Sequence, residues 1–230
     1  MTLIGANRIN DKWTMLADSA ATIWQIRTRA DTCYRPKIRL LEWKDVSLYV
    51  ASCWTIKDID FITNVIEKCL AKAKIKDTKQ LKFLLQDALE EGYSSLKTLT
   101  NDPSASFLFL EPKTDTLFIW DEYSITQVED YSVIVMWSWD QSFYKLFDSY
   151  VPDFYKAFKQ TVQADEYCDL PIVSVRDWEV KLWWWWEDEK RFNDYCYWTS
   201  DGNEILCCNG PIPVGAADEE HISRGTNKEL

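Results

Sequence analysis

Acidic side chains at the ends of two predicted strands are the residues of this sequence that could do enzymatic chemistry most directly. Asp121 and Glu122 follow a β-rich run that ends at Trp120, and Asp140 follows a second run that ends at Trp139. Two neighbouring carboxylates can serve as acid and as nucleophile or base in glycoside hydrolysis, and they can also bind a divalent metal ion. The pattern allows a carboxylate- or metal-dependent hydrolase, although acidic residues are also common in exposed loops.

Other catalytic groups are scarce. The single histidine, His221, lies in a C-terminal segment rich in charge, so the pattern disfavours a Ser-His-Asp or Cys-His arrangement. The six glycines are too widely spaced for a phosphate-binding loop. The seven cysteines have no C-x-x-C spacing and lie mostly in apolar or aromatic runs, which is typical of reduced, buried thiols. The main interpretation therefore expects no cofactor and no metal site.

Four consecutive tryptophans, Trp183–Trp186, are the most unusual feature of the sequence. In a strand over 178–186, successive side chains point to opposite faces. The face that carries charged residues earlier in this strand also carries Trp183 and Trp185, which indicates that both indoles are partly exposed. Exposed indoles are typical of binding surfaces, whereas a covering helix or chain segment would make them ordinary core residues.

Charge is divided unevenly along the chain, whose net charge is −11. Residues 1–100 hold 16 basic against 12 acidic side chains, and residues 101–230 hold 10 against 25. The acidic half should repel nucleic acid and attract a basic protein. Three acidic residues directly follow the tryptophans, so the sequence predicts an acidic, aromatic partner-binding patch. Its residues are Trp183, Trp185, Glu187, Asp188 and Glu189.

Basic residues of the first half concentrate in one segment, at Lys68, Lys72, Lys74, Lys76, Lys79 and Lys82. A solvated helix face accounts for such a run. The alternative is a contact with the acidic half of a second copy, which would make a homodimer through this Lys68–Lys82 basic face.

Periodicity predicts the elements that position these residues. Apolar residues at helical spacing indicate helices over 11–29, over 59–70, over 77–92 and along 143–162. Alternating and β-rich runs indicate strands over 38–43, 46–54, 106–110, 116–120, 132–139, 178–186, 195–198 and 204–208. Because strands and helices come in groups, the fold class is α+β with a mainly antiparallel sheet. Its helices are grouped in the N-terminal half, with one long helix in the C-terminal half.

Composition predicts a single domain over 1–208, with a subdomain boundary near 100–104, and a flexible C-terminal tail over 209–230. Neither an apolar leader nor a stretch of 18 apolar residues occurs in the sequence. We therefore expect a cytoplasmic protein without membrane contact.

Taken together, these patterns favour an acidic, Trp-rich binding module that inhibits or docks onto a basic protein, as an immunity protein or a virus- or phage-encoded inhibitor does. One alternative is a hydrolase that uses Asp121, Glu122 and Asp140. A carbohydrate-binding module, in which the indoles of Trp183 and Trp185 stack on sugar rings, is a third interpretation.

Overall fold

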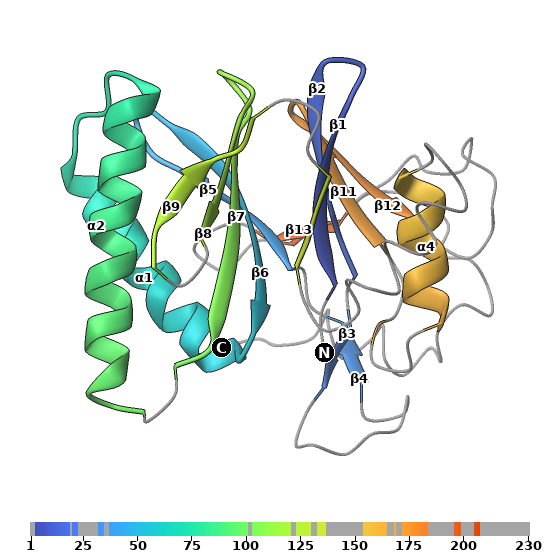
Figure 1. The fold of residues 1–230 in the computed structure, drawn as a ribbon, viewed down its shortest axis with the longest axis horizontal. Coiled ribbons are helices and arrows are strands. Elements are labelled where there is room, and N and C mark those ends of the chain that lie inside the picture. Colours follow the sequence, from blue (N-terminus) through green and yellow to red (C-terminus); the bar gives the residue numbers. More distant parts are fainter. Residues whose placement is uncertain are drawn as a thin grey trace.

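Two five-stranded antiparallel sheets pack face to face in the computed structural model, and helices cover both outer faces (Figure 1). The structure describes residues 3–18, 20–22, 32–34, 37–100, 103–120, 123–129, 133–136, 154–164, 168, 172–183, 196–198 and 205–207. Within these residues the layers follow the order helices, sheet, sheet, helix.

The first sheet has the strand order β10-β1-β2-β11-β12. Its strands are β1 (Ile4–Ile9), β2 (Lys12–Ala17), β10 (Val133–Met136), β11 (Ile172–Arg176) and β12 (Glu179–Trp183). Asn10 and Asp11 join β1 to β2 with φ values of 50° and 61°. This left-handed backbone matches the twist of a tight hairpin, and Asn and Asp tolerate it better than other non-glycine residues.

The second sheet runs in sequence order, β5-β6-β7-β8-β9. Its strands are β5 (Ile38–Glu42), β6 (Ser47–Trp54), β7 (Ala105–Glu111), β8 (Thr116–Trp120) and β9 (Ile125–Gln127). Two short hairpins complete the described strands, formed by β3 (Ala20–Thr22) with β4 (Thr32–Tyr34) and by β13 (Cys196–Trp198) with β14 (Ile205–Cys207).

Helices α1 (Ile56–Lys72) and α2 (Thr78–Lys97) cover the outer face of the second sheet, and α4 (Phe154–Ala164) covers that of the first (Figure 1). The side chain of Asp77 caps α2, because its carboxylate accepts a hydrogen bond of 2.8 Å from the amide of Gln80. Among the described helices, none is long and apolar enough to cross a membrane.

Three apolar clusters fill the spaces between the layers. One joins α1 and α2 to the second sheet, one lies between the two sheets, and one joins α4 to the first sheet. In β2, Trp13 and Met15 face the other sheet while Leu16 faces α4, so this strand is buried on both sides. Burial of this apolar surface is the main force that holds the layers together.

The predicted fold class is confirmed: the described chain is α+β, and its two main sheets are antiparallel. The hairpin predicted within 38–54 is β5 and β6, and the strands predicted over 106–110 and 116–120 are β7 and β8. The strands predicted over 195–198 and 204–208 correspond to the paired β13 and β14.

The helix predicted over 11–29 is wrong, because residues 12–17 form β2 and residues 20–22 form β3. A strand buried on both faces has no polar alternation. Its nearly continuous apolar run happened to match helical spacing at Trp13, Leu16 and Ala17. The end of the helix predicted over 77–92 is also wrong, since α2 continues through Gly92 to Lys97.

Candidate active site

A buried ion pair between Asp18 and Lys37 lies where the ends of the two sheets meet. The Nζ of Lys37 lies 2.7 Å from each carboxylate oxygen of Asp18. Asp18 is 0% exposed and Lys37 is 8% exposed. Removing two charges from water costs several kcal/mol per ion. The attraction between the two buried ions is of the same order as this cost. A pair like this one is therefore weak evidence for stability and a reason to look for a function.

Asp18 also forms two hydrogen bonds with Leu3, the first described residue of the chain. Its carboxylate accepts a hydrogen bond of 2.7 Å from the amide of Leu3, and its own amide donates one of 3.0 Å to the Leu3 carbonyl. These bonds continue the pairing of β1 with β2 by one residue and fix the start of β1 against the ion pair. The residue before Leu3 is Thr2, which lies outside the described residues.

The strands of the second sheet position the lysine. Lys37 immediately precedes β5, and its carbonyl accepts a hydrogen bond of 3.1 Å from the amide of Ser52 on β6. The start of β1 and the end of β6 lie at the same end of the two stacked sheets (Figure 1). Residues of both sheets thus contribute to one charged site.

Cys53, beside Ser52 on β6, is buried in the apolar layer between the sheets. Burial raises the pKa of its thiol to about 12, although the positive charge of Lys37 and a hydrogen bond with Ser106 act in the opposite direction. The thiol therefore stays protonated at neutral pH and is a poor nucleophile.

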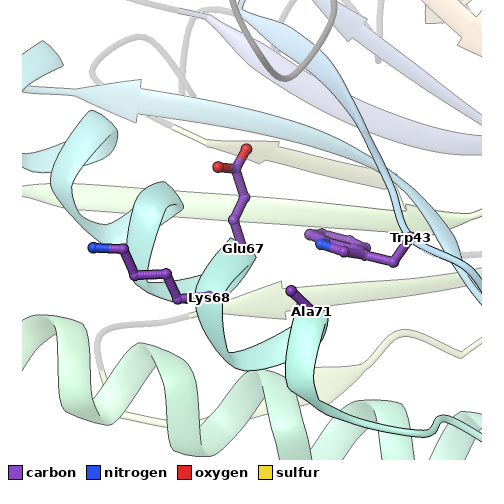
Figure 2. Close-up of a pocket in the computed structure, with 4 residues that line it drawn as sticks. All are labelled: Trp43, Glu67, Lys68 and Ala71. Carbon is purple, nitrogen blue, oxygen red and sulfur yellow. The ribbon is translucent and has the colours of Figure 1, made fainter.

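A hollow of about 270 Å³ lies against α1, lined by Trp43, Glu67, Lys68 and Ala71. Figure 2 shows the Trp43 ring lying toward Glu67 and Ala71, while the Lys68 side chain extends away from them. Burial raises the pKa of the Glu67 carboxyl group, and Arg39 opposes this effect. With one carboxyl group and neither a hydroxyl nor a thiol group in its lining, this hollow is a weaker candidate for catalysis than the Asp18–Lys37 pair.

The side chains of the candidate residues predicted from the sequence lie outside the part of the chain that the structure describes. Asp121, Glu122, Asp140, Trp185, Glu187, Asp188 and Glu189 lie outside the described residues, and of Trp183 only its backbone position at the end of β12 is described. No group of three or more His, Cys, Asp or Glu side chains gathers as a metal site in the part of the chain that is described. The carboxylate residues remain a prediction.

The sequence interpretation missed Asp18 and Lys37. They lie 19 residues apart and belong to no spaced motif. One weak signal was available, because Asp18 follows the apolar run Met15-Leu16-Ala17, where a charged side chain needs a buried partner. The nucleophile arrangements considered from the sequence were Ser-His-Asp and Cys-His, and both require a histidine.

Comparison with known proteins reveals no matching family model and no matching curated protein. Solved structures do match. An Anbu (Gly-1) mutant from Hyphomicrobium sp. strain MC1 is 14% identical, with 83% of this chain and 90% of that chain covered and a TM-score of 0.64. The helical assembly of the Anbu complex from Pseudomonas aeruginosa is 12% identical, with 83% and 89% covered and a TM-score of 0.59.

A third similar structure is BPH from Thiobacillus denitrificans in complex with epoxomicin. It is 16% identical to this chain, with 76% of this chain and 97% of that chain covered and a TM-score of 0.52. At these identities the likeness establishes the fold, which is a proteasome-like α+β fold with two antiparallel sheets.

The fold overturns the main functional prediction. The interpretation as an immunity protein or inhibitor is wrong, because the chain shares the proteasome-like fold of the Anbu and BPH structures. The predicted partner-binding residues lie outside the described side chains and stay a prediction; they are Trp183, Trp185, Glu187, Asp188 and Glu189. The prediction went wrong because it inferred function from excluding histidine, nucleotide and metal chemistry, which leaves histidine-free catalysis untested. The alternative of a hydrolase is closer to the finding.

Proposed function

We propose that this chain is a peptide hydrolase subunit whose nucleophile is the hydroxyl group of Thr2, made N-terminal by hydrolysis of the Met1–Thr2 bond. The observation that carries the proposal is the buried Asp18–Lys37 pair, whose carboxylate accepts a hydrogen bond from the amide of Leu3. A peptide bond holds neighbouring Cα atoms about 3.8 Å apart. Thr2 is bonded to Leu3, whose amide and carbonyl both form hydrogen bonds with Asp18, and the proteasome-like fold supports the same interpretation.

The charges suit a threonine that acts without histidine. An N-terminal threonine can use its own α-amino group as the general base. The ordinary pKa of such an amino group is about 7.7–8.0. A neighbouring positive charge such as the Lys37 ammonium favours the neutral form, which is the form that accepts a proton. Asp18 keeps the ammonium in place and compensates its burial.

Each step of the proposed reaction can be assigned to these groups. The Thr2 oxygen attacks the carbonyl carbon of the substrate, and the hydroxyl proton passes to the α-amino group. That proton then passes to the leaving amine as the peptide bond breaks, which leaves an ester between Thr2 and the acyl part of the substrate. A water molecule hydrolyses the ester, and the second product is a carboxylic acid.

We also propose that the chain works as a homo-oligomer in the cytoplasm. The Pseudomonas aeruginosa relative is described as a helical assembly of the Anbu complex, which supports self-association of this fold. Lys68 and Lys72 lie on α1, and Lys79 and Lys82 lie on α2. This basic face is our candidate for the contact with the acidic part of a second copy. Light scattering of the purified protein at low and high salt tests the contact, because added salt screens charge pairs.

Peptide hydrolysis by purified variants tests the proposed chemistry. We expect the purified protein to begin at Thr2 by mass spectrometry and to hydrolyse fluorogenic peptides. Thr2→Ala should abolish this activity, Thr2→Ser should keep part of it, and Asp18→Asn should lower it at least about a hundredfold. Lys12→Met removes one member of the exposed Lys12–Asp177 pair, far from the site, and serves as the matched control. Activity that survives Thr2→Ala, or a chain that keeps Met1 and is inactive, would contradict the proposal.

A further inference from the structure

The hollow against α1 combines an aromatic side chain with an acidic one. Trp43 lies in the turn between β5 and β6, and Glu67 lies on α1. Ala71 follows Glu67 by one helical turn on the same face of α1, and its small side chain leaves room beside the indole. Figure 2 shows the ring nearly edge-on, with the Glu67 carboxyl group above it and Ala71 below it. The volume of about 270 Å³ suits a small group, because pockets for drug-sized ligands have about 300–1,000 Å³.

The core between the second sheet and its helices fixes the two elements that line the hollow. The amide of Trp43 donates a hydrogen bond of 2.9 Å to the carbonyl of Val46, and the indole packs against this core. On α1, Glu67 directly follows Ile66, which is fully buried in the same core. The hollow is therefore formed before a ligand arrives, which lowers the entropy that binding costs.

The Glu67 carboxylate makes no hydrogen bond or ion pair with any residue that the structure describes. Burial raises the pKa of this carboxyl group, and the charge of Arg39 on β5 opposes the effect only in part. The Arg39 guanidinium is bound to Asp60, with its Nη2 atom 2.6 Å from Oδ1. Lys68 also lines the hollow, but its side chain extends away from Glu67 (Figure 2). A partly buried carboxylate of this kind favours a positively charged ligand, which compensates the lost hydration.

We infer that this hollow binds a guanidinium group, which stacks on the Trp43 indole and donates hydrogen bonds to the Glu67 carboxylate. The face of an indole attracts a cation. A guanidinium group is planar, so it stacks on the ring, and its fixed N–H groups match the two oxygens of a carboxylate. An ammonium group is more strongly hydrated and has no such plane, so it fits this pair of side chains less well.

Two sources carry the same group, namely a free guanidinium compound and an arginine within a peptide. Titration calorimetry of the full chain distinguishes them, with agmatine as the free compound and a capped Ala-Arg-Ala peptide as the other probe. Binding of both probes at one site assigns the hollow to an arginine of a peptide, and binding of agmatine alone assigns it to a free compound. A peptide with citrulline in place of arginine has nearly the same shape without the charge, and it should not bind.

Three variants test the contacts. Glu67→Gln removes the charge but keeps the shape of the side chain, and it should weaken binding of the guanidinium probe at least about tenfold. Trp43→Leu keeps an apolar contact with the core and should weaken binding about two- to fivefold. Ala71→Leu fills the hollow from an exposed helix position and should abolish binding, even where Trp43→Leu folds poorly.

Glu90→Gln is the matched control for the change of charge. Glu90 is exposed on α2 and accepts a hydrogen bond from Gln86, whose side chain also binds the amide of Ile125 on β9. Because β9 and β5 are opposite edges of the second sheet, this variant should leave binding unchanged. Unchanged binding in Glu67→Gln and Ala71→Leu, equal binding of the citrulline peptide, or no binding of either guanidinium probe would overturn the assignment. None of these results would affect the proposed hydrolysis.

Discussion

The ammonium group of Lys37 lies 2.7 Å from both carboxylate oxygens of Asp18, and this pair is almost completely removed from solvent. Asp18 directly follows β2 of the first sheet, and Lys37 directly precedes β5 of the second. Because the two sheets share the apolar layer between them, the packing of that layer determines how closely the two charges approach.

Removing one member of the Asp18–Lys37 pair should destabilise the protein strongly. We expect Asp18→Ala or Lys37→Met to lower the free energy of unfolding by about 3–5 kcal/mol, because each leaves an uncompensated buried charge. The double variant should lose less than the sum of the two single variants. Urea denaturation measures all three.

The exposed Lys12–Asp177 pair provides the matched control for this comparison, since its atoms are 2.9 Å apart but both side chains are more than 40% exposed. Lys12→Met should change the urea midpoint little, because exposed pairs contribute little to stability. Equal losses for the buried and the exposed pair would mean that burial of Asp18 and Lys37 has no special energetic role.

Stability should fall at alkaline pH because of two buried groups. Burial raises the pKa of the Cys53 thiol from 9.0 to about 12, and burial together with the charge of Glu42 raises the pKa of Tyr49 from 10.0 to about 12. Between these values the unfolded chain loses protons that the folded chain keeps. The stabilisation is complete below about pH 9 and is lost as the pH rises to 12, by about 1.4 kcal/mol per pH unit for each group.

Denaturation curves between pH 8 and 11 measure this dependence. Cys53→Ala and Tyr49→Phe should each flatten the fall in stability with pH, whatever their effect at pH 8. If the slopes of both variants matched that of the wild type, these two groups would not be responsible.

The sequence contained enough information to predict most of the second sheet and its helices. Short turns join β5 to β6 and β7 to β8, while α1 and α2 connect β6 to β7 and pack on the same sheet, so the local patterns agree with the packing. The first sheet was harder, because β2 is apolar on both faces and β11 was not predicted. Local periodicity cannot show that a strand lies between another sheet and a helix.

The candidate site could not be predicted in the same way. Asp18 and Lys37 meet only because β2 ends and β5 begins at the same end of the stacked sheets, which no spacing in the sequence encodes. The four-Trp run is unusual in composition, but composition does not show where its side chains lie in the fold.

Asp115 should be important for joining the two sheets at the end opposite the candidate site. It lies in the turn between β7 and β8, and its carboxylate accepts a hydrogen bond of 3.0 Å from the amide of Trp13 on β2. Asp115→Ala leaves this amide without its acceptor and should cost about 1–3 kcal/mol of stability. Asp115→Asn keeps an acceptor and should cost clearly less. Thermal denaturation distinguishes the two, and equal losses would argue against the hydrogen bond.

Gly92 should be required by the close approach of α1 and α2. A Cβ at this position would lie 3.3 Å and 3.4 Å from the two γ carbons of Ile62, which is fully buried and cannot move away easily. Alanine is favoured over glycine in a helix by about 1 kcal/mol, but overpacking costs about 1–3 kcal/mol. We therefore expect Gly92→Ala to destabilise the wild type by about 1 kcal/mol.

The background variant Ile62→Ala checks this explanation, because it removes both γ carbons. In that background Gly92→Ala should become stabilising, since only the helix preference remains. Chemical denaturation of the four proteins measures the reversal. A loss of the same size in both backgrounds would show that contact with Ile62 is not the cause.

The most direct measurement of the central claim is whether epoxomicin forms a covalent adduct with this protein, and on which residue. The compound is bound in the Thiobacillus denitrificans structure of the same fold. Intact-mass and peptide-mapping spectrometry should find one adduct, on Thr2, that is absent from Thr2→Ala and greatly slowed in Asp18→Asn. An adduct that persists in Thr2→Ala, or a processed chain that begins at Thr2 and forms none, would contradict the assignment of Thr2 as the nucleophile.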